Sequence, residues 1–400
     1  MRGFRLLAIG LSIAVTLSLL AGCTGGSRPQ TGRVTFQNGE ITLAGNLWIP
    51  AGEGPFPAIV LIHGAGKITS QDYTYLSFFF IHHGFATLTY DKRGVGESTG
   101  TYKMVDVKNG ESVLDELAGD ALAGVKFLKN HDQIDPNRIG FFGVSQAGWI
   151  APLAASKSPD VAFIVLYSGP VCTVGQEIYY SRTTGDDPGG EVEGISLEQA
   201  SDRARDYAGP HGFDPLPSLK AIDIPGFWMF GSQDRSIPVP LSIENLDSLF
   251  AQQGKDFSYI IYPNADHNLR DVNTEQFFPA MNDALNWLVE KFGDLINQSA
   301  PKAIETEADF TGFITEIHPI GEKGTLGQIL VESYTDKLVD KYMVTIKDET
   351  MIFKQNGEER RQVAFDMLET TQQVQIWFSG PVMESFPMQA TAQQVVIIEY

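Results

Sequence analysis

The sequence predicts an α/β protein: a doubly wound, mostly parallel sheet over residues 33–296, followed by a small all-β domain over residues 308–400. Before residue 300, short and continuously apolar runs alternate with segments of helical period, as in sheets whose strands are buried on both faces. Beyond it, only short β-like runs follow. Hydrophobic side chains make up 43% of the 400 residues and charged ones 20%, which excludes a mainly disordered or collagen-like chain.

The charge balance and the cysteine count narrow the classes of partner. The chain has 29 basic and 49 acidic side chains, so its formal net charge is −20. Because an acidic surface repels phosphate backbones, we expect no nucleic-acid partner. Only two cysteines are present, which excludes a disulfide framework, and no CxxC or His/Cys cluster indicates a zinc site. We therefore expect no metal.

The first residues have the pattern of a secretory signal. Two arginines precede an apolar run over residues 6–20, which is shorter than the roughly 20 apolar residues that a spanning helix needs. Leu20-Ala21-Gly22-Cys23 then resembles a bacterial lipobox, where a peptidase cleaves before a cysteine that carries diacylglycerol. We expect residues 1–22 to be removed, Cys23 to be lipidated, and residues 23–32 to form a flexible tether on the extracytoplasmic face of the cell membrane. An uncleaved anchor is the alternative.

The predicted sheet begins with a hairpin, because two alternating segments within residues 33–49 flank Asn38-Gly39, a sequence typical of tight β-turns. Apolar runs predict buried strands at Ala58–Ile62, Ala86–Tyr90, Ile139–Val144, Val161–Tyr167, Phe227–Phe230 and Tyr259–Tyr262. Helical periodicity predicts helices at Leu114–Asn130, Gly148–Ala155, Pro240–Gln253 and Glu275–Phe292. Strands that alternate with helices indicate the doubly wound sheet.

A polar, proline-containing linker over residues 297–307 separates the two predicted domains. Short β-like runs follow at Gly312–His318, Gln328–Glu332, Tyr342–Ile346, Met351–Lys354, Gln373–Phe378 and Gln394–Glu399. Apart from a turn near residues 363–368, no helical pattern crosses this region. A small β-barrel is the architecture that such a pattern favours.

The stretch over residues 139–149 carries the first sign of chemistry. A buried strand leads into Gly143-Val144-Ser145-Gln146-Ala147-Gly148, and helical spacing follows. The nucleophile-elbow motif is written G-x-S-x-G, and it places an exposed serine on a sharp turn between a strand and a helix. Ala147 replaces the usual second glycine, which the crowded turn tolerates because alanine has the next smallest side chain. Ser145 is therefore the candidate nucleophile.

The partners of such a serine follow it in the order acid, then histidine. Asp234 comes just after one buried strand, and His267 lies in the loop after the last strand. All three candidates thus lie at the carboxyl ends of strands, where α/β active sites form. Of the seven histidines, only His267 follows the acid, lies in the sheet domain and ends a strand. Asp266 is a rival acid, but an immediate neighbour is poorly placed to hold the far nitrogen of His267.

Acyl transfer also needs hydrogen-bond donors for a tetrahedral oxyanion. The residue after the nucleophile supplies one of them, the backbone N–H of Gln146. The loop after the strand at 58–62 supplies the other, and we assign it to the backbone N–H of Ala65. His63 we assign to a structural role under that loop. No metal or organic cofactor is expected, because the triad supplies both the nucleophile and the base.

These motifs resemble the α/β-hydrolase superfamily, and in particular the bacterial hydrolases related to dienelactone hydrolases and serine aminopeptidases. The resemblance covers residues 33–295 and includes the Asp-x-Arg-Gly-x-Gly-x-Ser turn at residues 91–98. In such proteins this turn forms the floor of the site and is not itself catalytic. A nucleotide-binding loop is the alternative, but no G-x-G-x-x-G opens a helix there. A fairly short insertion at about residues 171–225 occupies the lid position, which implies an open pocket.

Residues 308–400 resemble a small OB-like β domain of unknown function found in Bacillus-type lipoproteins. Such barrels often bind oligonucleotides, but residues 301–400 contain 8 basic and 16 acidic side chains, and this acidic balance argues against that use. The aromatic side chains of this region are expected in the barrel core. Cys172, in the other domain, is expected to be a small buried apolar residue.

The sequence thus predicts a lipid-anchored serine hydrolase that cleaves a small ester through an acyl-enzyme. An amide hydrolase of the serine aminopeptidase type is the nearest alternative, because acidic residues in the insertion are available to bind a substrate ammonium. A third hypothesis is a non-catalytic binding lipoprotein on a hydrolase scaffold. We expect a monomer, held at the membrane through Cys23.

Overall fold

In the computed structural model, the described residues are 30–400, apart from 51, 53, 187–194, 275–276, 293–307, 323, 335–338, 357–358, 381, 384–386 and 400. The predicted signal over residues 1–22, the predicted lipidation site at Cys23 and the predicted linker at 297–307 lie outside the described residues. Among those described, no helix is both long and apolar enough to cross a bilayer.

The first sheet has eight strands in the order β1-β2-β4-β3-β5-β6-β7-β8. Their bounds are β1 Gln30–Asn38, β2 Ile41–Ile49, β3 Phe56–Ile62, β4 Ala86–Tyr90, β5 Ile134–Val144, β6 Ile164–Tyr167, β7 Gly226–Gly231 and β8 Phe257–Tyr262. The predicted hairpin is confirmed: Asn38 pairs with Ile41 across the turn, and Gly39 takes the positive φ of 59° that this turn requires. From β4 to β8 all neighbours are parallel, so the predicted mostly parallel, doubly wound sheet is confirmed.

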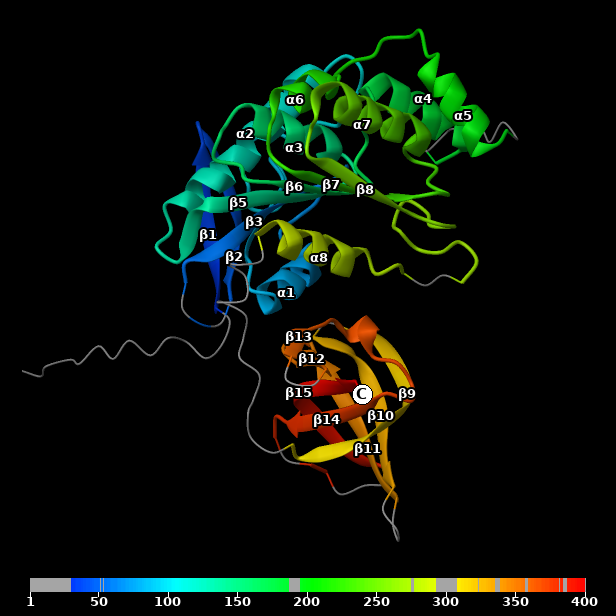
Figure 1. Cartoon of the computed structure of the whole chain (residues 1–400). Helices are drawn as coiled ribbons and strands as arrows, with labels where there is room; N and C mark the ends of the chain where they lie inside the picture. Colours follow the sequence, from blue (N-terminus) through cyan, green and yellow to red (C-terminus); the bar gives the residue numbers. More distant parts are fainter. Residues whose placement is uncertain are drawn as a thin grey trace, which may run out of the picture.

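Helices cover both faces of this sheet, with α1 and α8 on one side and α2, α3, α6 and α7 on the other (Figure 1). The helices are α1 Thr74–His82, α2 Gly110–Lys129, α3 Ala147–Ser156, α4 Val174–Thr184, α5 Leu197–Arg205, α6 Leu216–Ala221, α7 Val239–Gln253 and α8 Ala280–Phe292. Because helices occupy both faces, the central strands are apolar on both sides, and β3 is buried at every residue.

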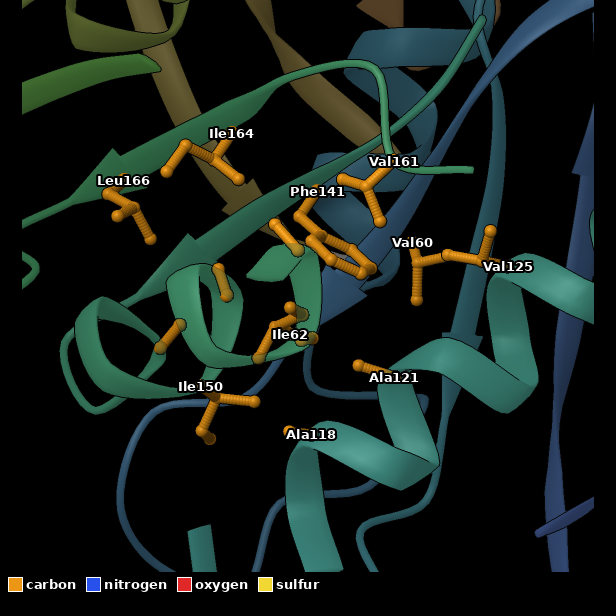
Figure 2. Packing of buried hydrophobic residues seen from close by; sticks show 14 of the residues in the cluster. Val60, Ile62, Ala118, Ala121, Val125, Phe141, Ile150, Val161, Ile164 and Leu166 are labelled. Carbon is orange, nitrogen blue, oxygen red and sulfur yellow. The ribbon is translucent and has the colours of Figure 1, made fainter. Parts of the chain in front are cut away.

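The larger core lies between the sheet and helices α2 and α3. Figure 2 shows its contacts, which join Val60, Ile62, Phe141, Val161, Ile164 and Leu166 to Ala118, Ala121, Val125 and Ile150. The α2 helix approaches closely at Gly124, where a Cβ would lie 3.2 Å from the Val60 side chain. A second core packs α1 and α8 onto the opposite face, with Phe80 and Phe142 edge to face at 5.3 Å. Burial of each side chain of this size stabilises the folded state by about 1.5–3 kcal/mol, relative to leaving it exposed.

The insertion between β6 and β7 folds as helices α4, α5 and α6. Two of them begin with capping boxes that are visible in the sequence: Thr173 pairs with Gln176 at the start of α4, and Ser196 pairs with Gln199 at the start of α5. Each such cap stabilises its helix by about 1 kcal/mol. Helix α4 is not predicted from the sequence, because its apolar residues show no clear helical stripe.

The C-terminal region forms a separate sheet with strands β9 Phe310–Glu322, β10 Thr325–Tyr334, β11 Val339–Lys347, β12 Met351–Asn356, β13 Glu359–Gln362, β14 Gln373–Phe378 and β15 Met388–Glu399. Strand β11 pairs with both β10 and β15, which closes the predicted barrel. The expected turn appears as a short 3₁₀ helix at Phe365–Met367. Of the aromatic residues expected in the core, Trp377 is buried, whereas Phe313 is 43% exposed.

Several predicted elements differ in their bounds. Helix α8 begins at Ala280 rather than at residue 275, because Pro279 favours the first turn of a helix over its interior. Strand β6 begins at Ile164, three residues later than predicted, and β5 begins at Ile134, five residues earlier. Helix α1 was not predicted, since its residues are apolar on all sides and leave no period to detect.

Candidate active site

Ser145 lies on the sharp turn between β5 and α3, as the sequence predicts. Its φ is 52°, a left-handed conformation that is rare for a residue with a side chain and typical of the nucleophile elbow. Two hydrogen bonds hold this turn: the Ser145 N–H donates to the Tyr167 carbonyl at 2.8 Å, and its carbonyl accepts from the Gly148 N–H at 2.8 Å. The turn is thereby tied both to the end of β6 and to the first turn of α3.

Small residues around Ser145 are a steric requirement. A Cβ on Gly143 would lie 2.3 Å from the Cβ of Ala147, and a Cβ on Gly148 would lie 2.5 Å from the nitrogen of Pro170. Both distances are far below van der Waals contact. Ala147 is therefore accommodated because the residue that faces it, Gly143, has no side chain.

Asp234 follows β7 and is held by three hydrogen bonds. One carboxylate oxygen accepts from the N–H groups of Ser236 at 2.7 Å and Ile237 at 3.0 Å. The other lies 2.8 Å from Nδ1 of His267. The Asp234 side chain has no exposed surface, so the backbone donors fix the carboxylate in the direction of the imidazole.

His267 lies in the loop after β8 and combines burial with an anionic partner. Burial by itself lowers the pKa of the imidazole, but the Asp234 carboxylate and its hydrogen bond outweigh this effect, so the pKa lies above its ordinary value. Asp266, the rival acid, is engaged elsewhere, because its carboxylate accepts from the N–H groups of Asn268 and Arg270. The structure therefore brings His267 together with Asp234 and not with Asp266.

The end of β6 connects the histidine loop to the serine turn. Tyr167 accepts from the Ser145 N–H, and the next residue, Ser168, donates its hydroxyl to the His267 carbonyl at 2.8 Å. In the part of the chain that the structure describes, no hydrogen bond joins Ser145 directly to His267, and the Ser145 hydroxyl has no other partner. Nucleophile–base contacts of this type are often loose before substrate binds.

The two predicted oxyanion donors lie beside Ser145. Ala65 and Gln146 border the same cavity as Ser145, and a Cβ on Gly64 would lie only 3.6 Å from the Ser145 Cβ. Among the hydrogen bonds of the described residues, neither the Ala65 N–H nor the Gln146 N–H has an acceptor. Two amide groups that have no acceptor and border the same cavity as the serine are candidates to bind an oxyanion.

His63 has the structural role that the sequence suggests. It is 2% exposed, and its Nε2 lies 2.5 Å from the Tyr90 carbonyl, to which it donates. Burial and the nearby Lys92 ammonium lower its pKa to about 3, so the ring is neutral. Cys172 is also buried as expected, and burial raises the pKa of its thiol.

The cavity over Ser145 has a volume of about 240 Å³. The sequence did not identify its walls, which come from the loop before α2, from α3, from the segment after β6, from α4 and from the segment after β7: Met104, Val105, Asp106, Trp149, Pro170, Val174, Glu177, Ile178, Ser181, Arg182 and Ile237. The insertion therefore forms a wall of the cavity through α4. Among the described residues, no group of three or more His, Cys, Asp or Glu side chains is placed to hold a metal ion.

Two sequence profiles of known protein families match parts of the chain. The sequence profile of the "Prolyl oligopeptidase family" matches residues 72–295, and that of a "Protein of unknown function (DUF3221)" matches residues 322–399. The second match coincides with most of the C-terminal barrel.

Curated relatives include hydrolases. Esterase EstD of Thermotoga maritima is 26% identical over 228 residues, which are 51% of this chain and 53% of the esterase. Acyl-coenzyme A thioesterase 3 of Mus musculus is 22% identical over 284 residues, 69% of this chain and 60% of the thioesterase. The quorum-quenching protein AidA of Acinetobacter baumannii is 29% identical over 133 residues, 33% of this chain and 41% of that protein. The chain thus spans less than two thirds of the length of these relatives.

Solved structures with a similar arrangement include an esterase of Pyrococcus furiosus, at 17% identity and a TM-score of 0.49, covering 65% of this chain and 91% of the esterase. A dienelactone hydrolase from Anabaena variabilis, at 18% identity and a TM-score of 0.43, covers 66% of this chain and 98% of that enzyme. The mostly parallel eight-stranded sheet and the profile match over residues 72–295 indicate the α/β-hydrolase fold. Since its profile matches residues 72–295, more than half of the 400 residues, the chain belongs to the prolyl oligopeptidase family.

Proposed function

We propose that this protein is a membrane-anchored serine hydrolase that cleaves short-chain carboxylic esters through an acyl-enzyme. The observation that carries the proposal is the combination of Ser145 at φ 52° with the Asp234–His267 pair at 2.8 Å. Strained serine turns and Asp–His pairs each occur in other settings. Together, at neighbouring strand ends and beside two free amide groups, they match the requirements of nucleophilic acyl transfer.

The proposed reaction follows from the positions of the atoms. Asp234 accepts a hydrogen bond from the Nδ1–H of His267, which leaves the unprotonated Nε2 as the base that removes the hydroxyl proton of Ser145. The serine oxygen attacks the ester carbonyl, and the N–H groups of Ala65 and Gln146 stabilise the resulting oxyanion. His267 then returns the proton to the departing alcohol. Water, activated in the same way, releases the acid from the acyl-enzyme.

The size of the cavity supports a small acyl group. Its volume of about 240 Å³ is below the range of about 300–1,000 Å³ that is typical of drug-sized ligand pockets. Trp149 and Ile178 contribute apolar surface to its walls. The names of the esterase and thioesterase relatives point to the same class of chemistry, the transfer of an acyl group from an ester or a thioester.

Amide cleavage is the second candidate, favoured by two observations. The family is named for oligopeptidases, and the carboxylates of Glu177 and Asp106 lie in the wall of the cavity, where they are placed to attract a substrate ammonium. A non-catalytic binding lipoprotein remains the third hypothesis, and a lack of turnover on both esters and amides supports it.

The anchoring part of the proposal rests on the lipobox-like sequence that ends at Cys23. A Cys23→Ala variant expressed in a bacterium is expected to leave the membrane fraction or to retain an unprocessed N-terminus without diacylglycerol. Mass spectrometry of the mature N-terminus distinguishes these outcomes. A variant that is processed and membrane-bound like the parent would contradict lipidation at Cys23.

The enzymatic proposal is tested with p-nitrophenyl esters of two to twelve acyl carbons, beside the Ser145→Ala variant and a set of aminoacyl amides. We expect turnover of the shortest esters, a decline with chain length, and no turnover by Ser145→Ala. An optimum at long chains would contradict the small acyl site. Faster turnover of amides than of esters would establish the second candidate instead.

A further inference from the structure

Lys92 is a buried cation directly beneath the candidate oxyanion hole. It follows β4, in the Asp91-Lys92-Arg93-Gly94 turn, and is only 2% exposed. Its ammonium donates three hydrogen bonds, to the Gly64 carbonyl at 2.6 Å, to the Gly66 carbonyl at 3.3 Å and to the side-chain oxygen of Gln146 at 3.0 Å. One side chain therefore connects the loop after β3 to the turn after β5.

The three acceptors of this ammonium flank both predicted oxyanion donors. Ala65, which carries one donor, lies between the two glycines whose carbonyls bind Lys92. Gln146, which carries the other donor, binds Lys92 through its own side chain. Glycine at position 66 is required for this arrangement, because its φ is 94°. The distance between the two donor amides thus depends on the lysine.

We infer that Lys92 is the positioning residue of the oxyanion hole: its ammonium fixes the N–H groups of Ala65 and Gln146 relative to each other and adds a positive charge behind them. This inference rests on the proposed function, since it assigns a role within the same site. It also gives a reason for glutamine after the nucleophile, because its amide oxygen accepts from the lysine.

The charge of Lys92 has no anionic partner among the described residues. The carboxylate of the adjacent Asp91 accepts instead from the N–H groups of Ser70 at 2.7 Å and Glu97 at 2.9 Å. Burial raises the pKa of Asp91, but these hydrogen bonds outweigh it, so this carboxyl is ionised at neutral pH and directed away from the ammonium. A cation that is not neutralised in a buried site exerts a stronger field than it would in water.

The other charged and titratable groups that face Lys92 do not neutralise it either. His63 is neutral, and the Tyr73 hydroxyl is un-ionised, because burial raises its pKa. The ring of Tyr102 lies 6.0 Å from the ammonium of Lys92 and 5.8 Å from that of Lys67. Burial lowers the pKa of Lys92 to about 8, so the ammonium is present at neutral pH and is lost in mild alkali.

The test compares Lys92→Met, which keeps the length of the side chain but removes its charge, with a matched control in the full chain. Lys255 is also buried, at 8% exposure, and its ammonium binds the Ile222 carbonyl and the Asp223 carboxylate, each at 2.8 Å. Its contacts lie outside the candidate site. Lys255→Met therefore reports the cost of removing a buried lysine without touching the oxyanion hole.

We expect Lys92→Met to lower kcat for p-nitrophenyl acetate by about 10–100-fold with KM within about threefold, somewhat less than the loss of a direct oxyanion donor. Lys255→Met is expected to keep kcat within about twofold. The kcat/KM of the parent should fall above pH 8, and this alkaline limb should be absent in Lys92→Met. The inference would be overturned if the parent and Lys92→Met had equal kcat. It would also be overturned if the loss of kcat in Lys92→Met were no larger than the fraction of that variant that is unfolded.

A fluorophosphonate separates failure of this inference from failure of the proposed function. Phosphonylation of the serine also develops negative charge on an oxygen in the hole, so Lys92→Met should react about 10–100-fold more slowly than the parent, whatever the natural substrate is. If the parent is labelled but cleaves no ester, the substrate proposal fails while the labelling rates still test Lys92. A folded parent that neither reacts nor cleaves contradicts both.

Discussion

Nδ1 of His267 lies 2.8 Å from a carboxylate oxygen of Asp234, although 33 positions separate the two residues in the sequence. The contact follows from topology, because β7 and β8 are adjacent parallel strands and the loops after them leave the same edge of the sheet. Ser145 follows β5 at that same edge. Because these strands run parallel, the serine, the acid and the histidine that follow them in the sequence all lie at one edge of the sheet.

Replacement of Asp234 by asparagine should abolish most of the activity without unfolding the protein. The amide NH2 can donate to Nδ1, which favours the imidazole tautomer with its proton on Nε2, so kcat is expected to fall by about 10⁴-fold, as in other Ser-His-Asp enzymes. Steady-state kinetics on p-nitrophenyl acetate, with circular dichroism to verify the fold, measures this effect.

Asp266→Asn is the matched control for that substitution. Asp266 neighbours His267 in sequence but binds the N–H groups of its own loop. Its replacement should leave kcat within about threefold of the parent. A larger loss for Asp266→Asn than for Asp234→Asn would show that the acid had been assigned to the wrong carboxylate.

The pH dependence of kcat/KM should have an acidic limb set by His267. The imidazole must be neutral to accept a proton, and the Asp234 carboxylate holds its pKa above the ordinary 6.5 despite the opposing effect of burial. Activity is therefore expected to fall as the pH decreases through a value above 6.5. In Asp234→Asn the residual activity should show this limb at lower pH, since burial is then opposed only by the smaller effects of the Asp186 and Glu177 carboxylates.

The same shift links stability to pH. Because the pKa of His267 is higher in the folded state, its contribution to the free energy of unfolding is fully present below about pH 6.5 and is lost as the pH rises through the folded pKa. Urea unfolding at pH 6 and pH 8.5 measures it, and His267→Gln, which lacks the titrating group, should reduce the difference between the two values.

Gly143→Ala should destabilise the serine turn, because the new Cβ would lie 2.3 Å from that of Ala147. Overpacking of this kind costs about 1–3 kcal/mol, and displacement of Ser145 should also lower kcat. The double variant Gly143→Ala/Ala147→Gly removes the clash and should recover most of both losses. If the double variant were no better than Gly143→Ala, the contact with Ala147 would not be the cause.

The structural ion pair between Arg93 and Asp120 should be important for stability. The Asp120 side chain is fully buried and accepts from two guanidinium nitrogens of Arg93, at 2.6 and 2.9 Å. Asp120→Ala removes the two shortest hydrogen bonds of the guanidinium and leaves it only its contacts with Glu116 at 3.2 and 3.9 Å, so it should lower the free energy of unfolding by about 3–5 kcal/mol. Asp160→Ala, which removes an exposed pair with Lys129, should change it by less than about 1 kcal/mol. Equal effects would contradict this difference.

The fold was largely predictable because the central strands are buried on both faces. The run Ala58–Ile62 is apolar throughout, and the only polar residues of Ala86–Tyr90, Thr87 and Thr89, are buried as well, as expected for a parallel sheet that is covered on both faces. Helix α1 escaped prediction for the same physical reason, since a segment that is apolar all round shows no period. Strand β13, at Glu359–Gln362, is short and charged and gives no β signal.

The candidate site was predictable where it depends on strand ends and not where it depends on folded loops. Ser145, Asp234 and His267 each follow a strand, so their positions derive from the sheet. Glu177 lines the cavity because of the way the insertion packs over the end of the sheet. No local sequence pattern predicts this packing. The burial of Lys92 could not be predicted from the sequence either, because a lysine in a glycine-rich turn is usually solvated.

The most direct test of the account is the site of covalent labelling by a fluorophosphonate, determined by peptide mass spectrometry on the folded protein. The account predicts a single adduct on Ser145, its loss in Ser145→Ala, and its retention in Ser168→Ala, a serine that lies nearby and also has a positive φ of 50°. An adduct on Ser168, or no adduct on a folded protein, would contradict the assignment of Ser145 as the nucleophile.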